Sequence, residues 1–338
     1  ELRKSLIQTI KFLIFLVIGI ILLWLAFRNV ETRKLIAGLQ DADYKWVILS
    51  VIFGLFAYLS RTRRWVLLIK PLGYNPSFKN SFFSLMTGYL ANLALPRLGE
   101  ITRCVALGKK EKIPVDQLFG TVVIERTIDL ISLLSITVAL VLQRGEQINQ
   151  FLKVSILIPL QQKVFSMFGF TWLVWLVLLI VMILALFLLV KFRHRLRKIR
   201  FFAKIIDMVK GFVNGLKTII HLKNKWEFIF HTVFIWFNYT LMTWIVVYAI
   251  DSTSHLTFSD SIFLLVIGGL AMSAPVQSGL GAFHYIISRG LAFVKGVKIE
   301  DGLVYAFLTH ESQLIFVVIV GTISFFMISG IPQRNRED

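Results

Sequence analysis

Long apolar runs are the feature that most constrains this chain. Several contain about 18 or more mostly apolar residues, enough for a helix to cross a hydrocarbon layer about 30 Å thick. Of the 338 residues, 57% are hydrophobic, and the mean hydropathy is +0.75. The alternating pattern of a membrane β-barrel does not occur in the sequence. We therefore predict an all-α polytopic membrane protein.

Six segments are predicted to cross the membrane completely. Each is a mainly apolar run bounded by polar or charged residues, as is typical of a transmembrane helix. The predicted spans are residues 6–27, 46–69, 116–142, 170–190, 226–249 and 303–329.

Two further apolar stretches are interrupted in the middle. The stretch 78–108 breaks at Pro96 and Gly99, and the stretch 260–295 breaks at a proline and two glycines. Proline removes a helix donor and glycine permits a tight reversal, while irregular backbone at membrane depth needs protein or a wet cavity around it. We expect two re-entrant broken-helix hairpins; a complete crossing by the first stretch would instead give eight or more spans. The break residues of the second stretch are Pro275, Gly279 and Gly281.

The distribution of positive charge sets the predicted orientation. Lysines and arginines gather in residues 61–70 and 191–204, whereas residues 251–260 contain none. Because cytoplasmic loops carry more Lys and Arg, both termini are predicted to lie in the cytoplasm. The order span, span, hairpin, span then occurs twice with every direction reversed. This order indicates an inverted-topology repeat whose broken helices meet near the midplane and form a substrate site.

The repeat divides one transmembrane domain, residues 1–338. Residues 1–143 form the first repeat and residues 170–330 the second. Residues 144–169 mix charged and apolar side chains and are predicted to lie along the outer interface. The basic segment 191–225 is predicted to lie on the inner leaflet, as a loop or as an amphipathic helix attracted to anionic headgroups.

Six ionisable residues occupy the membrane segments around the first break. At a helix centre each costs about 2.5–3.5 kcal/mol, so these groups must pair or face water. Glu125 and Asp129 are four residues apart and share one helix face, where Arg97 and Arg103 can meet them across the hairpin. Such a network either joins hairpin to helix or holds a phosphate. The six residues are Arg97, Glu100, Arg103, Glu125, Arg126 and Asp129.

The second break carries polar residues that we predict to bind substrate, namely Gln277, Ser278 and His284. No strand precedes the Gly-x-Gly of residues 279–281, so close helix packing explains it better than a nucleotide loop. His284 fits either a hydrogen-bonded packing role or proton coupling.

The last predicted span contains His310 and Glu311, which we predict to form a proton relay. Glu311 is expected to pair with Arg289 or His284. A second histidine at zinc-protease spacing is absent, and Cys104 is the single cysteine of the sequence. We therefore expect no metal, no other cofactor, no disulfide and no cysteine metal cluster.

The net charge of +18 points to lipid as a partner. Its cations lie mainly between apolar segments, which indicates membrane topology and anionic lipid, with no nucleic acid as partner. Small residues in "VIGGLAMSA" suit close helix packing, either within one chain or in a homo-oligomer.

The motifs "NLALPRLGEITR", "ERTIDL" and "PVQSGLGAFH" resemble those of the lysylphosphatidylglycerol synthase transmembrane-domain family. That family looks like the flippase domain of the bacterial multiple peptide resistance factor and includes stand-alone membrane proteins. The similarity covers about residues 5–330. It implies lipid translocation between leaflets of a bacterial cytoplasmic membrane. The residues on matching positions are Asn92, Pro96, Arg97, Gly99, Glu100, Arg103, Glu125, Arg126 and Asp129.

Two departures from the family pattern bear on function. The soluble aminoacyl-transferase domain is absent from this sequence, so we expect a protein that is not an enzyme. His284 stands where the second motif usually ends in glutamate, which leaves the headgroup or coupling ion open.

The leading hypothesis is a flippase or transporter of a phospholipid or polyprenyl-phosphate lipid. A membrane glycosyltransferase that uses polyprenyl sugars is the alternative, because Asp41 and Asp43 in the first outer loop could bind a metal. An ion-coupled transporter of a soluble anion would use the same arginines.

Overall fold

The computed structural model describes residues 32–94, 98–153, 158, 222–272, 279 and 281–330. Helices are the only regular secondary structure in these ranges, which confirms the all-α prediction. Several predicted features lie outside the described residues. They are the spans 6–27 and 170–190, most of the basic segment 191–225, and Pro96, Arg97, Pro275, Gln277 and Ser278.

The chain forms two compact units. Residues 1–140 and 219–338 make up one unit, and residues 141–218 make up the other. All interactions reported below lie within the first unit.

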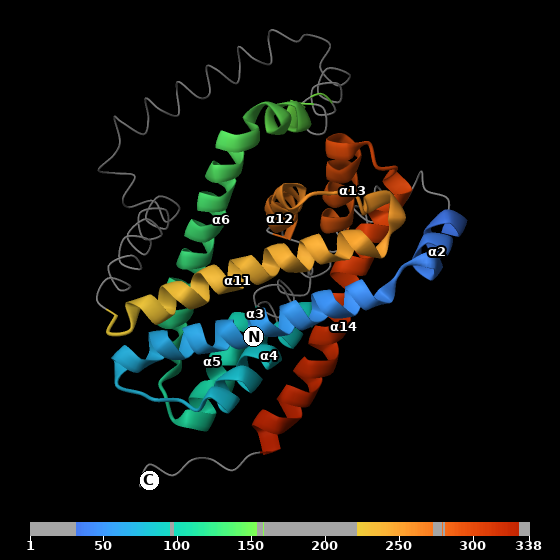
Figure 1. The fold of residues 1–338 in the computed structure, drawn as a ribbon. Coiled ribbons are helices and arrows are strands. Elements are labelled where there is room, and N and C mark those ends of the chain that lie inside the picture. The colour runs from blue at the N-terminus through green and yellow to red at the C-terminus, as the bar shows by residue number, and fades with distance from the viewer. Residues whose placement is uncertain are drawn as a thin grey trace, which may run out of the picture. The chain divides into compact units, whose positions relative to one another are not determined.

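The described elements follow the same order in both halves of the chain (Figure 1). In each half a long helix is followed by two shorter helices and a second long helix; in the first half a further short helix, Thr32–Asp41, precedes them. The first half contains α2 (Thr32–Asp41), α3 (Tyr44–Ile69), η1 (Lys70–Leu72), α4 (Phe78–Ala94), α5 (Leu98–Glu111) and α6 (Val115–Leu152). The second half contains α11 (Lys225–Ile245), η3 (Val246–Ala249), η4 (Asp251–Thr253), α12 (Phe258–Met272), α13 (Ala282–Lys295) and α14 (Ile299–Gly330).

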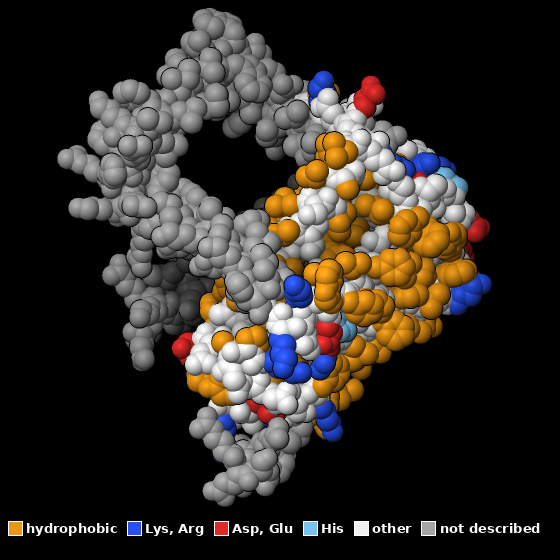
Figure 2. All heavy atoms as spheres, turned by 60° about the vertical axis from the view of Figure 1, so that its left-hand side comes forward, with side chains coloured by type: hydrophobic (Ala, Val, Ile, Leu, Met, Phe, Trp, Pro, Cys, Tyr) orange, Lys and Arg blue, Asp and Glu red, His pale blue; other side chains and the backbone are white. Residues whose placement is uncertain are grey.

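In the described part of the chain, three helical stretches are long and apolar enough to cross a membrane: Tyr44–Leu72, Lys225–Ala249 and Ile299–Gly330. They match the predicted spans 46–69, 226–249 and 303–329. Figure 2 shows hydrophobic side chains gathered over a broad face of the described residues. Along α14 one stripe of exposed apolar residues recurs every three or four positions, as a lipid-facing stripe does. It comprises Ile315, Ile319, Ile323 and Phe326.

Helix α6 differs from the expected span 116–142. It continues to Leu152, with a non-helical residue at Arg144 (φ −134°, ψ 30°). The predicted outer segment therefore begins as a continuation of this helix. Helix α6 is long enough to cross a membrane, but the charged motif Glu125–Asp129 makes it less apolar than the three stretches named above.

Helices α4 and α5 form the first predicted hairpin. They pack so closely that a Cβ built on Gly88 would lie 2.7 Å from the Gly99 carbonyl oxygen. We expected Gly99 to be a break residue, but it lies in the first turn of α5. The role of Gly99 is instead to let two backbones touch, because any side chain would separate them.

Helices α12 and α13 form the second hairpin. Gly268 of α12 lies against Phe283, and Gly290 of α13 lies against Ile267. Gly279 and Gly281 between the helices have φ of +72° and +76°, a backbone region that favours glycine. The two glycines therefore lie in the interval between α12 and α13, where the break is predicted.

Helix α11 packs along α3 in the opposite direction (Figure 1). The Ser50 hydroxyl donates to the Met242 carbonyl at 3.1 Å, and Ser60 contacts His231 Nδ1 at 2.7 Å. Position numbers rise along one helix as they fall along the other, so the two helices are antiparallel. Helix α14 packs on α4, where Gly321 meets Leu90.

Candidate functional site

The Glu125 carboxylate on α6 is the centre of an ion-pair network. Its side chain is completely buried. Arg61 Nε on α3 donates to one carboxylate oxygen at 2.9 Å, and Arg103 Nη1 on α5 donates to the other at 3.1 Å. One carboxylate therefore joins three helices through charge-assisted hydrogen bonds.

Asp129 extends the network one turn along α6. Its carboxylate accepts a hydrogen bond from Arg64 Nη2 at 2.6 Å and another from Arg61. Both acids thus face the same partner helix, as their spacing predicts. The α3 arginines are three residues apart, so they match that face.

Arg126 and Glu100 form the more open edge of the network. Arg126 lies 3.7 Å from Glu100, 3.6 Å from Glu125 and 3.6 Å from Asp129. The Arg126 side chain is 41% exposed. These separations are longer than the hydrogen bonds that Arg61 and Arg103 donate to Glu125, so Arg126 is the least constrained cation among the described residues of the network.

Aromatic side chains hold the buried arginines in place. The Arg103 guanidinium lies over the Trp65 ring at 4.7 Å, a cation–π contact. Trp65 Nε1 in turn donates to Thr121 Oγ1 at 2.9 Å. Arg61 Nη1 donates to the Tyr239 hydroxyl on α11 at 2.7 Å, which connects the network to the second half of the chain.

Sequence reasoning missed Arg61 and Arg64 as members of this site. We used their charge only to orient the predicted span 46–69, but they lie inside α3 with exposed fractions of 5% and 0%. Their three-residue spacing within an apolar run was the signal that points to a buried face. Arg63, between them, turns away and pairs with Glu227 at 2.6 Å.

Among the described residues, this network holds one positive charge in excess. Four arginines meet three carboxylates, those of Glu100, Glu125 and Asp129. Arg103 Nε and Nη2 are buried and donate no hydrogen bond. An excess charge with unused donors is suited to an anion.

A small pocket adjoins these donors. Its volume is about 10 Å³, room for about one water molecule. Asn92 lines it, but the Asn92 amide oxygen already accepts a hydrogen bond from the Gly99 N–H at 2.7 Å. Asn92 therefore closes the hairpin. The lining residues are Leu85, Gly88, Tyr89, Asn92, Gly99, Glu100, Arg103 and Arg126.

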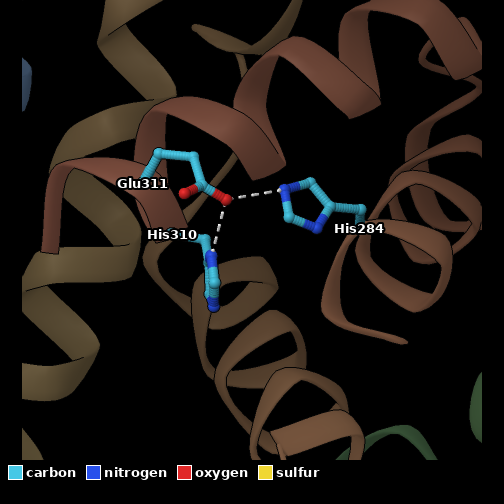
Figure 3. A group of neighbouring side chains, drawn as sticks. All are labelled: His284, His310 and Glu311. Carbon is cyan, nitrogen blue, oxygen red and sulfur yellow. Dashed lines mark hydrogen bonds and ion pairs between the residues drawn. The ribbon is translucent and has the colours of Figure 1, made fainter. Parts of the chain in front are cut away.

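A second polar cluster joins α13 to α14. One carboxylate oxygen of Glu311 points toward two imidazole rings (Figure 3). It lies 2.9 Å from His310 Nδ1 and 3.4 Å from His284 Nε2. The expected pairing of Glu311 is thus with His284; the alternative partner, Arg289, lies over the Tyr285 ring at 3.7 Å. The predicted substrate or proton role of these residues stays a prediction.

Asp43, just before the start of α3, has a structural role. Asp43 is the N-cap of α3, and its carboxylate accepts a hydrogen bond from the Lys45 N–H at 3.3 Å. The Lys45 ammonium lies 2.6 Å from the same carboxylate. Asp41 is the last residue of α2. Helix capping thus accounts for Asp43, and the glycosyltransferase alternative stays a prediction.

We predict that at neutral pH Asp43→Ala lowers the melting temperature more than Asp43→Asn does, because asparagine caps a helix as well as aspartate and loses only the charge interaction with Lys45. The side-chain hydrogen bond with Lys45 lowers the pKa of Asp43 below its ordinary 3.8. The charged form therefore stabilises the fold above that value, and this contribution is lost as the pH falls through the lowered pKa. Melting curves of both variants between pH 3 and 7 measure this; equal effects of both substitutions would contradict the capping role.

These features define a class: a multi-pass membrane protein with an ion-pair network buried among its helices. The chain belongs to the lysylphosphatidylglycerol synthase TM region family, whose profile matches residues 10–321. This match confirms the resemblance noted in the sequence.

One relative is the UPF0104 membrane protein MJ1595 of Methanocaldococcus jannaschii. It is 32% identical over 126 residues, which cover 36% of this chain and 38% of the relative. This alignment therefore spans well under half of either protein. No solved structure matches the chain.

Proposed function

We propose that this protein moves a lipid with a phosphate headgroup between the two leaflets of its membrane. The observation that carries this proposal is the excess positive charge of the buried network. At a rise of 1.5 Å per residue along the helix axis, Arg61 lies about 12 Å from the end of α3 and Glu125 lies about 15 Å from the start of α6. At such depth an uncompensated charge is costly, and a phosphate would offset it.

The membership of the family supports a lipid as substrate. The family description refers to the membrane region of a lysylphosphatidylglycerol synthase, and a membrane region that accompanies lipid synthesis fits the transfer of that lipid across the bilayer. The aminoacyl-transferase activity itself is not proposed for this chain.

An apolar groove near the network suits an acyl chain. It lies between α3 and α11, is open to the surface, and has a volume of about 410 Å³. Residues of one α3 turn alternate between the two features: Ser60 and Arg63 line the groove, while Arg61 and Arg64 enter the network. The groove is otherwise lined by Phe56, Leu59, Phe78, Phe230, His231 and Phe234.

The small volume of the pocket beside Arg103 means that a phosphate cannot enter without motion. The α4–α5 hairpin must shift relative to α6 to admit it. We propose that this hairpin and the α12–α13 hairpin are re-entrant and related by an inverted repeat, so that opposite motions expose the site to each side in turn.

Arg126→Gln is expected to slow lipid translocation about 10-fold or more while leaving the protein folded. Loss of a charged hydrogen-bond donor to phosphate costs about 1.5–3 kcal/mol, and 1.4 kcal/mol corresponds to a factor of ten. The long contacts and exposure of Arg126 make it dispensable for folding. The assay follows fluorescent phosphatidylglycerol in proteoliposomes, with a membrane-impermeant quencher that reports the outer leaflet.

Lys45→Gln, which removes an exposed cation from the start of α3, is the matched control and should translocate at the wild-type rate. Equal rates for Arg126→Gln and wild type would overturn the assigned mechanism. Efflux of entrapped inorganic phosphate, without lipid movement, would instead indicate a transporter of a soluble anion.

A further inference from the structure

The cluster His284, His310 and Glu311 contains the donor set of a transition-metal site. Two imidazole nitrogens and one carboxylate oxygen lie within 4.8 Å of one another. Histidine and carboxylate are the usual protein ligands of catalytic zinc sites, which use three protein ligands and keep a fourth position open. We propose that this cluster binds one first-row divalent cation of the zinc class.

The separations between the donor atoms favour this use. Bond lengths of about 2.0–2.2 Å around tetrahedral zinc place its ligand atoms about 3.3–3.5 Å apart. Glu311 Oε1 lies 3.4 Å from His284 Nε2 and 2.9 Å from His310 Nδ1. The distance from Glu311 to His284 therefore matches this spacing, whereas the distance from Glu311 to His310 is shorter and must lengthen slightly when an ion binds.

Charge also favours a cation at this place. Glu311 lies in the span Ile299–Gly330, where a carboxylate needs a positive partner. In the first half of the chain, arginines supply that charge to Glu125 and Asp129. At Glu311 the neighbouring side chains are imidazoles, which neutralise it either by taking a proton or by holding a metal ion with it.

The surroundings suit a bound ion. His284 is completely buried and His310 nearly so, whereas the Glu311 side chain is 26% exposed. The Phe307 ring packs against His284 at 5.0 Å, and the Phe283 ring packs against His310 at 5.3 Å. An apolar shell strengthens metal–ligand bonds, and the exposed side of Glu311 leaves an entry path and an open coordination position.

The test uses the full-length protein in detergent, stripped with a chelator and titrated with Zn²⁺ in a calorimeter. Wild type should bind one equivalent. His284→Ala and Glu311→Gln should each lower the affinity at least 10–100-fold, since loss of even an outer partner of a ligand costs that much. His255→Ala is the matched control, because His255 lies on the exposed turn before α12; its affinity should equal that of wild type.

A gain of signal guards against variants that fail to fold. His284→Cys keeps a ligand at this position, so Co²⁺ should produce a thiolate-to-cobalt absorption band that wild type lacks. No Zn²⁺ binding by wild type, equal binding by His284→Ala, or no cobalt band in the cysteine variant would overturn the metal site and favour a shared proton. Metal binding is measured without lipid, so this result is independent of the translocation assay.

Discussion

Replacing Glu125 by glutamine is expected to lower the free energy of unfolding by about 3–5 kcal/mol, the cost of breaking a buried ion pair on one side. Glutamine keeps the shape of the side chain but removes its charge. Arg61 and Arg103 would then face a neutral partner while remaining buried. The excess charge of the described network would rise from one to two. Thermal unfolding in detergent, followed by circular dichroism, measures the loss.

The control for this prediction lies on the same helix. Asp116 is an exposed carboxylate in the first turn of α6. Asp116→Asn removes only a favourable interaction with the helix dipole and should cost no more than about 0.5–1 kcal/mol. A loss at Glu125 as small as that at Asp116 would show that the network does not depend on this carboxylate.

A second substitution can restore the balance of charge. Arg103→Gln in the Glu125→Gln background returns the network to one excess positive charge. Because the two side chains are in direct contact, the double variant should be more stable than Glu125→Gln alone, with a coupling energy of about 0.5–3 kcal/mol. Additive losses would mean that packing, and not charge, explains the single variant.

The second large effect is expected from Gly99→Ala. A Cβ at this position would overlap the Gly88 carbonyl oxygen and would lie 2.6 Å from Asn92 Cγ. Backbone atoms cannot rotate away as a flexible side chain can, so α4 and α5 would have to separate. We expect the free energy of unfolding to fall by about 1–3 kcal/mol or more, the range of overpacking in a well-packed interior. The hydrogen bond from the Gly99 N–H to Asn92 should also be lost.

Gly120→Ala is the matched control for the hairpin. Gly120 lies in α6, and a Cβ there meets no atom within 4 Å. Alanine is favoured over glycine in a helix by about 0.5–1 kcal/mol, so this variant should be as stable as wild type or more so. The melting temperatures of the Gly99→Ala and Gly120→Ala variants measure the two effects. If both substitutions stabilise the protein, the close approach of α4 to α5 is wrong.

Hydropathy predicted the helices well because membrane helices satisfy their own backbone hydrogen bonds, so their positions depend on local composition. Helices α3, α11 and α14 match three predicted spans in place and type. The acids of α6 were also predicted to need partners, since ionisable groups inside a span are costly unless they are paired. Gly279 and Gly281 were predicted to break the second stretch, and their positive φ values agree.

Contacts between residues on different helices were not predictable from local composition. Arg61 and Arg64 resemble the cations of a cytoplasmic loop, and only their packing against α6 identifies them as buried partners of Asp129. In the sequence Gly99 resembles a break residue, yet its role is to allow close contact with Gly88, which lies 11 positions away on another helix.

The sequence by itself determined that this chain is a helical membrane protein, where helices α3, α11 and α14 lie, and which acids need partners. These properties follow from local composition and from the cost of charge in hydrocarbon. The tertiary structure decided which cations meet Glu125, and that His284, His310 and Glu311 share one site. Such pairings depend on helix packing between residues far apart in the chain, and spacing along one helix cannot specify them.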